Sequence, residues 1–298
     1  MEGYVATIGM FDGVHRGHRF VLQRLVQTAV ERGLQPMVIT FDHTLRRDPL
    51  LTPLDEKLFL LSKAGVKRVE VLPFTDRLRQ MTAHEFMEQV LKKQFQVSVL
   101  LTGYDNRFGH DRCEGFDDYV RYGRELGMEV ESLPPAPSKE KGEHISSSFI
   151  RQLLQEGRVS EANEALGYCY TLLGRVEHGE HVGTGLGFPT ANLMPVDDRQ
   201  IVPAAGVYAV KVRLENSVEQ KHAMMNIGHR PTFNGQRQTL EVHIFQLHED
   251  LYGQRLQVTF VERLRDEQRF ASPEALRRQL QQDAQEAAAL LNKEKEEI

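Results

Sequence analysis

Residues 4–18 read YVATIGMFDGVHRGH, and this stretch decides the fold of the first half of the chain. The apolar run 4–8 predicts a short buried strand. A glycine-rich turn follows, and residues 18–32 then repeat apolar side chains at helical spacing until Gly33 ends the pattern. This strand–turn–helix unit predicts an open α/β sheet, in which ligands lie at the carboxyl ends of the strands.

The same alternation continues to about residue 166. Further strands are expected at 36–41, 69–72 and 97–101, and further helices at 55–64, 117–126, 147–156 and 160–166. Thr82 and Glu85 form a capping-box signature that opens another helix. Strands that alternate with helices predict a parallel sheet with helices on both faces.

The pattern changes near Tyr168. Short strand-like runs then dominate, at 171–177, 206–214, 222–226, 240–246 and 257–261. They predict a small antiparallel barrel, followed by a terminal helix with Ser272 as its cap and Pro273 at its first position. The expected fold class is therefore α/β plus mainly β: a Rossmann-like domain over 1–168 and a β-barrel domain over 169–298.

The composition is that of a globular protein with small-molecule partners. Of the 298 residues, 40% are hydrophobic and 27% charged, and the net charge of -5 disfavours a nucleic-acid groove. Two cysteines fit a reducing cytosol, and no apolar stretch approaches the about 20 residues that span a bilayer. A cytoplasmic protein without a membrane partner, monomeric or weakly homo-oligomeric, is expected.

The turn in residues 9–18 suits phosphate binding. Gly9, Gly13 and Gly17 let the backbone approach a phosphate closely, at the positive end of the following helix. His15 and His18 would donate hydrogen bonds as negative charge grows on a transferring phosphoryl group. Two other interpretations stay open, namely histidines that only cap the helix and a zinc site that lacks an obvious third ligand.

A second anion clamp is expected where three hydroxyl side chains, Ser146, Ser147 and Ser148, precede Arg151 by one helical turn. Ordinary serine capping is the alternative. Residues 103–109, which include Asp105, follow a predicted strand end, where a bound substrate would lie. A solvated turn explains their spacing equally well.

The second phosphate-binding stretch, residues 183–192, reads GTGLGFPTAN. Gly183 and Gly187 would let this loop wrap the phosphates of ATP. Thr190 and Asn192 would offer oxygen atoms to Mg²⁺, which prefers such ligands and keeps several waters.

Glu241 is the candidate general base beside that loop. Strand alternation places Glu241, His243 and Phe245 on one face, and a carboxylate at a barrel mouth could take the proton of an attacking hydroxyl. An exposed strand residue is the alternative. His178, His181 and His243 suggest a metal cluster or, alternatively, surface and supporting roles.

Both stretches resemble bacterial bifunctional riboflavin kinases/FAD synthetases over nearly the whole chain. The family's Gly-x-Phe-Asp-Gly-x-His-x-Gly-His motif falls on residues 9–18 and its Ser-Ser-Thr-x-x-Arg motif on residues 146–151. Its Gly-Phe-Pro-Thr-Ala-Asn motif falls on residues 187–192, and its catalytic base falls on Glu241. The resemblance adds Phe11 and Pro189 to the expected ligand-binding residues.

The resemblance implies two steps that share ATP. The C-terminal domain would phosphorylate riboflavin to FMN with Mg²⁺, and the N-terminal domain would adenylylate FMN to FAD and release pyrophosphate. Two rivals remain. One module could be inactive, because residues 41–45 lack the family's Pro-His-Pro; or the chain could sense flavins without catalysis, which Glu241, Thr190 and Asn192 argue against.

Overall fold

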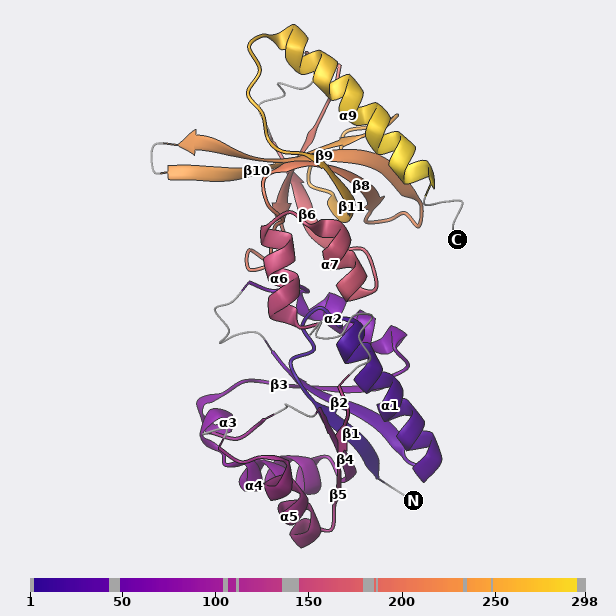
Figure 1. Cartoon of the computed structure of the whole chain (residues 1–298), viewed down its shortest axis with the longest axis vertical. Coiled ribbons are helices and arrows are strands. Elements are labelled where there is room, and N and C mark those ends of the chain that lie inside the picture. The colour runs from indigo at the N-terminus through magenta and orange to yellow at the C-terminus, as the bar shows by residue number, and fades with distance from the viewer. Residues whose placement is uncertain are drawn as a thin grey trace. The chain divides into compact units, whose positions relative to one another are not determined.

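The computed structural model describes residues 3–42, 49–103, 107–110, 113–135, 145–178, 185, 187–232, 235–247 and 249–293. The chain forms two compact units, Met1–Ser147 and Ser148–Ile298 (Figure 1). Each unit has its own sheet, as expected from the change of pattern near Tyr168.

The first unit is built on a five-stranded parallel sheet with the order β3-β2-β1-β4-β5. Its strands are β1 (Tyr4–Ile8), β2 (Gln35–Phe41), β3 (Arg68–Leu72), β4 (Val97–Gly103) and β5 (Glu129–Leu133). The central strand β1 lies between β2 and β4, so the order of the strands reverses beside β1. Such a switch point is where open α/β sheets bind ligands, outside the carboxyl ends of the strands.

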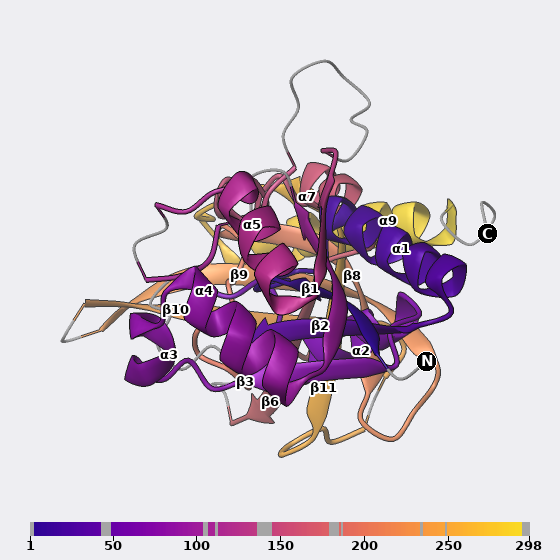
Figure 2. The same cartoon turned by 90° about the horizontal axis from the view of Figure 1, so that it is seen from below.

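Helices cover both faces of this sheet, which confirms the predicted doubly wound arrangement. They are α1 (Arg16–Arg32), α2 (Leu54–Lys63), α3 (Asp76–Gln80), α4 (Ala83–Glu85), η1 (Phe86–Gln94) and α5 (Phe116–Leu126). On one face Leu22 and Leu25 of α1 pack with Val5, and on the other Phe86 and Tyr119 pack with the strands. Figure 2 shows α1 on one side of the sheet and α4 and α5 on the other.

Some elements of this unit were not predicted. The capping box is present, because Glu85 N donates to Thr82 Oγ1 at 3.2 Å and Thr82 N donates to Glu85 Oε2 at 2.9 Å. The helix that it opens continues as a π-helix, η1, which a period of 3.6 does not reveal. Strand β5 lies at the edge of the sheet, and only its last residue, Leu133, is buried, so its sequence has no strong apolar run.

The second unit contains the predicted barrel, closed by six antiparallel strands in the order β10-β7-β6-β11-β8-β9. These are β6 (Thr171–Glu177), β7 (Ala191–Pro195), β8 (Gly206–Leu214), β9 (Gln220–Thr232), β10 (Gly235–Ile244) and β11 (Arg255–Arg265). Side chains such as Val210, Val258 and Phe260 are fully buried and fill the inside. Sequence patterning missed β7, because Leu193 is its only buried residue.

Helices α6 (Ser147–Gln155) and α7 (Val159–Leu166) belong almost entirely to the second unit. Asn163 Nδ2 donates to the carbonyl of Phe260 at 2.9 Å and its Oδ1 accepts from Tyr170 N at 2.6 Å, which ties α7 to the barrel. The compact units divide between Ser147 and Ser148, at the start of α6.

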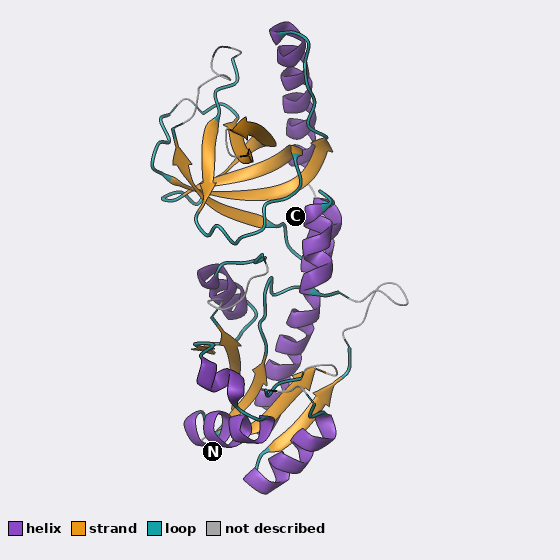
Figure 3. Ribbon diagram, turned by 90° about the vertical axis from the view of Figure 1, so that its left-hand side faces the viewer, coloured by secondary structure: helices purple, strands orange, loops and turns teal. Residues whose placement is uncertain are grey.

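The terminal helix α9 (Pro273–Lys293) begins at the predicted proline and lies along one side of the barrel (Figure 3). Ala287 and Leu291 of α9 pack against Ala209 and Met224 on the strands. Each helix that the structure describes, α9 included, is too short or too polar to cross a membrane.

A buried ion pair fastens α9 to the barrel. Arg265, at the end of β11, donates to the Asp283 carboxylate from Nε at 2.9 Å and from Nη2 at 2.7 Å. Asp283 is 1% exposed, and Gln279 Nε2 donates to its Oδ1 at 2.9 Å. A two-pronged guanidinium–carboxylate pair of this kind fixes orientation as well as distance.

We predict that Asp283→Ala lowers the free energy of unfolding by about 2 to 3 kcal/mol, because it leaves a largely buried guanidinium without its carboxylate. Urea denaturation followed by fluorescence measures this. The control Glu161→Ala removes the exposed partner of Arg158 and should change stability little. Equal losses in the two variants would contradict the anchoring role of the Arg265–Asp283 pair.

Candidate functional site

The first candidate site is the loop of residues 9–15, which connects the carboxyl end of β1 to α1. Its first residue still pairs with the sheet, because Gly9 N donates to the carbonyl of Ile39 at 3.1 Å. The loop then opens the helix, with His15 as the N-cap of α1. The stretch that decides the fold therefore ends at the switch point of the sheet and at a helix N-terminus, where free backbone N–H groups favour anions.

The backbone of this loop is held in unusual conformations. Phe11 has a φ of 50° and Val14 a φ of 34°, and Gly13 has a φ of 80°. Left-handed backbone costs little at glycine but is strained at a β-branched residue such as Val14. Such conformations persist only where surrounding contacts fix them, and they cluster at functional sites.

The buried carboxylate of Asp12 supplies one set of those contacts. Its Oδ1 accepts from Leu51 N at 3.0 Å and from Thr52 N at 3.1 Å, and the side chain is fully buried. Gly13 N in turn donates to Thr52 Oγ1 at 3.1 Å. Hydrogen bonds therefore hold the segment before α2 against the loop after β1.

The two histidines lie together at the start of α1. Their rings stack with centroids 3.6 Å apart and an angle of 19° between the planes. His15 Nδ1 accepts from His18 N at 3.3 Å, so His15 caps the helix as well as facing its neighbour. Gly17 leaves room for this ring, because a Cβ atom at this position would lie 3.2 Å from the His15 ring and the ring would have to shift. His15 is thus the N-cap of α1, whereas the side chain of His18 makes no capping bond.

His18 keeps a buried ring nitrogen available. Its Nδ1 has no hydrogen-bond partner among the residues that the structure describes. Burial lowers the pKa of His18 well below its usual value, and the nearby His15 and Lys57 lower it further. The ring is therefore neutral at pH 7 and one of its nitrogens can serve a ligand.

The serine motif reaches this loop from far along the chain. Ser147 Oγ donates to the carbonyl of Asp12 at 2.9 Å. Ser146 is half-buried beside it, whereas Ser148 is exposed. Arg151 lies one turn into α6 and is 7% exposed. Two of the predicted ligand-binding residues, Asp105 and Gly183, lie outside the described residues, as does His181.

The second candidate site is a polar row that crosses four neighbouring strands of the barrel. Strand register pairs Glu177 on β6 with Asn192 on β7, Asn192 with Glu241 on β10, and Glu241 with Asn226 on β9. Residues directly opposite each other in antiparallel strands present their side chains on the same face. The fold therefore places one carboxylate on each side of Asn192.

Glu241 lies on the outer face of β10. Val242 and Ile244 are buried inside the barrel, so the alternating residues Glu241 and His243 face outward. His243 Nδ1 lies 2.8 Å from the carbonyl of Pro189, in a hydrogen bond whose direction depends on the tautomer. The outer face of β10 therefore borders the end of the glycine-rich loop.

That loop ends beside two neighbouring hollows. Gly187 has a φ of 84°, a left-handed conformation that suits glycine. Pro189, Thr190 and Asn192 line a hollow of about 180 Å³ together with His178.

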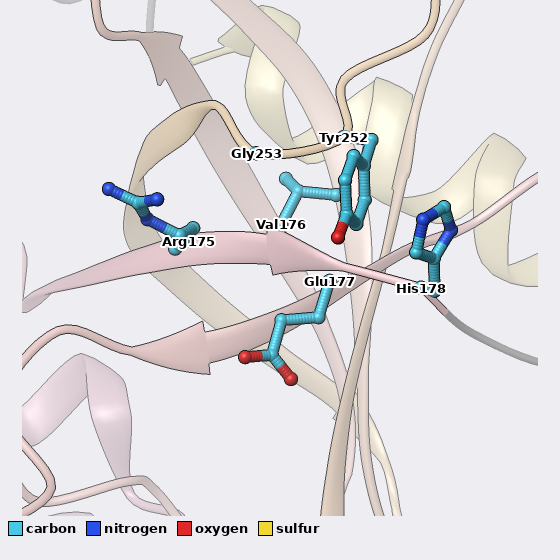
Figure 4. Close-up of a pocket in the computed structure, with 6 residues that line it drawn as sticks. All are labelled: Arg175, Val176, Glu177, His178, Tyr252 and Gly253. Carbon is cyan, nitrogen blue, oxygen red and sulfur yellow. The ribbon is translucent and has the colours of Figure 1, made fainter.

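An adjoining hollow of about 390 Å³ is lined by Arg175, Val176, Glu177, His178, Tyr252 and Gly253 (Figure 4). The rings of His178 and Tyr252 stack there at 3.6 Å.

The candidate metal cluster includes His178 and His243. Within the part of the chain that the structure describes, no three His, Cys, Asp or Glu side chains gather so that they could hold a metal ion. His178 instead stacks on Tyr252, and His243 contacts Phe188 and Phe245. These contacts match the alternative of supporting roles for both histidines.

Sequence reasoning missed two residues of the first site. Asp12 belongs to the quoted stretch, but nothing local shows that its carboxylate turns inward to bind the segment before α2. Lys57 is fully buried on the same helical stripe as Leu61, four residues on. A lysine at an apolar position of a helix was the available signal for it.

Family models match both halves of the chain. A family model described as FAD synthetase matches residues 1–149, and one described as riboflavin kinase matches residues 166–291. Two domains of flavin-nucleotide synthesis therefore follow each other on this chain.

Curated relatives match the chain over most of its length. The bifunctional riboflavin kinase/FMN adenylyltransferases of Escherichia coli K12 and Haemophilus influenzae are 40% and 37% identical, over 95% and 98% of this chain and 91% and 96% of theirs. The relative from Bacillus subtilis is 34% identical over 95% of this chain and 91% of its own. The chain belongs to the bifunctional riboflavin kinase/FMN adenylyltransferase family.

A solved structure also matches nearly the whole chain. The crystal structure titled macrolide-efflux protein from Streptococcus pneumoniae is 31% identical, covers 95% of this chain and 93% of its own, and has a TM-score of 0.85.

Glu56, the neighbour of Lys57 on α2, gives a test of the electrostatics. Its Oε2 is buried without a hydrogen-bond partner among the described residues, and burial raises the pKa of the carboxyl to about 7. The native state therefore keeps a proton that the unfolded chain releases near its ordinary pKa of 4.5. As the pH rises from about 4.5 to 7, Glu56 increasingly destabilises the fold.

We predict that Glu56→Gln stabilises the protein at pH 8 by about 1 to 3 kcal/mol, because glutamine has no charge to desolvate. At pH 4.5 the variant and the unchanged chain should be equally stable. Urea denaturation at both pH values measures the difference. The matched control Glu31→Gln, on the exposed side of α1, should show no such pH dependence. A pH-independent effect of Glu56→Gln would contradict the raised pKa.

Proposed function

We propose that the chain makes FAD from riboflavin in two ATP-dependent steps, with adenylyl transfer at the loop of residues 9–15 and riboflavin phosphorylation beside residues 187–192. The observation that carries this proposal is the stacked pair His15 and His18 at a helix N-terminus, at the switch point of the sheet. The predicted division into an adenylyltransferase domain, 1–168, and a kinase domain, 169–298, is part of the proposal.

In the adenylyl transfer, a phosphate oxygen of FMN attacks the α-phosphorus of ATP, and pyrophosphate leaves as the bond between the α- and β-phosphates breaks. This reaction needs alignment and charge stabilisation rather than a protein nucleophile. Gly9, Phe11 and Gly17 would shape the loop around the nucleotide. His18, with its available Nδ1, and His15 would hydrogen-bond phosphate oxygens as their charge grows.

The serine motif would complete the nucleotide site. Ser147 already supports the loop through the Asp12 carbonyl. Ser146, Ser148 and Arg151 would bind ATP phosphates, the arginine through its two-pronged guanidinium. Asp105, which follows β4 in the sequence, would bind the substrate.

In the kinase reaction, a hydroxyl oxygen of riboflavin attacks the γ-phosphorus of ATP, and ADP leaves. Glu241 would accept the hydroxyl proton, which makes the oxygen a better nucleophile. Its position directly opposite Asn192 supports this role. Gly183, Gly187 and Pro189 would form the loop that binds the ATP phosphates.

The residues beside Asn192 fit a magnesium ion. Thr190 offers a hydroxyl oxygen and Asn192 an amide oxygen, and the strand register adds Glu177 and Glu241 on either side of Asn192. Hard oxygen ligands of this kind, few in number, suit Mg²⁺. The ion, when bound, would neutralise charge on the ATP phosphates.

The low net charge and the two cysteines favour a cytoplasmic enzyme without a nucleic-acid partner. We propose a monomer or weak homo-oligomer whose partners are riboflavin, FMN, FAD and ATP.

Glu241→Gln should lower FMN formation from riboflavin at least about 100-fold, because the amide cannot accept the hydroxyl proton. FAD formation from supplied FMN and ATP should be unchanged. Chromatography of the products after incubation with magnesium measures both. The control Glu219→Gln, on the exposed hairpin between β8 and β9, should leave both activities unchanged. If a folded Glu241→Gln variant lost both activities together, the assignment of two separate sites would be wrong.

The double variant His15→Ala, His18→Ala should show the reverse pattern. FAD formation from FMN should fall at least about 100-fold, because the donors to the phosphate oxygens are gone. FMN formation should be retained. His84→Ala, at a histidine on α4 outside the loop, is the matched control. Retained FAD synthesis in the double variant would dismiss the role of both histidines.

A further inference from the structure

A lysine with no exposed surface contacts the loop of residues 9–15 in the first unit. Lys57 is on α2, and its side chain is fully buried. An ammonium group that leaves water must find oxygen partners, or the cost of burial would neutralise it or unfold the site. The partners of Lys57 therefore show what its burial achieves.

The ammonium joins the ends of two neighbouring strands. Lys57 Nζ donates to the carbonyl of Phe41 at 2.9 Å, to Thr40 Oγ1 at 3.2 Å and to the carbonyl of Met10 at 3.3 Å. Thr40 Oγ1 also donates to the Met10 carbonyl at 3.1 Å. The lysine, the threonine and the Met10 carbonyl thus close a triangle of hydrogen bonds.

These partners have a definite place in the fold. Phe41 is the last residue of β2, and Met10 lies in the loop after β1, two residues past the strand. Because β1 and β2 are adjacent and parallel, both groups lie at the carboxyl edge of the sheet. Lys57 therefore fixes the distance between the loop of residues 9–15, which leads to the two histidines, and the end of β2.

The charge of Lys57 also reaches the histidines. After burial and the influence of His15, Lys57 is a further cause that lowers the pKa of His18. Water screens a buried cation less than an exposed one, so its charge extends further. The same positive charge favours a polyphosphate at the loop.

We propose that Lys57 is a positioning residue for adenylyl transfer: by holding the Met10 carbonyl against the end of β2, it sets the place of His15 and His18 relative to the reacting phosphates. This inference rests on the proposed function of the N-terminal unit. A misplacement of about 1 Å in such a site can lower the rate about 100-fold. A positioning role therefore affects kcat more than the binding of ATP.

Lys57→Met, which keeps the length of the side chain but removes the ammonium, tests this on the full chain. We expect kcat for FAD formation from FMN and ATP to fall at least about 10-fold, and KM for ATP to change less than about 3-fold. Riboflavin phosphorylation, measured on the same sample, should be unchanged. Proton NMR titration of the His18 ring should give a higher pKa than in the unchanged chain, because the nearby cation is gone.

The matched control is Lys63→Met, which removes the same charge from an exposed position of the same helix. It should leave kcat, KM and the His18 titration unchanged. Thr40→Val is a second test, because it removes one partner of Lys57 and the bridge to Met10 while keeping the shape of the side chain. We expect kcat to fall in the same direction with KM for ATP retained.

Wild-type kcat in a folded Lys57→Met variant would overturn the proposal. An increase of KM for ATP with no loss of kcat would also overturn it. If Lys57→Met does not fold, Thr40→Val decides, and its wild-type kcat would overturn the proposal. An unchanged chain that made no FAD from FMN and ATP would instead overturn the proposed function and, with it, this inference. Loss of kcat in both variants but not in Lys63→Met would support it.

Discussion

The N-terminal site depends on one constraint, the anchoring of the strained loop after β1 by buried polar groups. Phe11 and Val14 hold left-handed backbone that an isolated turn would not keep. Asp12, within the loop, accepts from the backbone N–H groups of Leu51 and Thr52, and Lys57 on α2 donates to the carbonyl of Met10. Because both side chains are fully buried, breaking their contacts would leave a desolvated charge, and the loop is therefore rigid.

In the barrel unit, strand register places the polar side chains of the site. Asn192 lies opposite Glu177 on one side and Glu241 on the other, so four adjacent strands bring polar side chains into a row. Register is set where one face is buried, and here the inward residues Val176, Leu193 and Val242 set it. The apolar interior thus determines which polar groups meet on the outer face.

The position of Glu241 shows how far patterning alone can go. Alternation correctly separates Glu241 and His243 from the buried Val242. It does not tell which of the two faces lies inside the barrel, because both faces of β10 carry side chains that pack, and Phe245 and Phe188 join the cluster under α9. Strand β7 has a single buried residue, and sequence patterning did not predict it. Its pairing with β6, rather than its composition, makes it a strand.

The sequence by itself determined the two unlike halves, the parallel and antiparallel sheets, and the two glycine-rich stretches, because hydrophobic period, glycine and capping residues act on their near neighbours. Only the tertiary structure decided that Ser147 supports Asp12 across more than a hundred residues, that Lys57 turns inward, and that Glu177 flanks Asn192. These contacts join segments far apart in the chain, and they form only when packing against a shared core has brought those segments together.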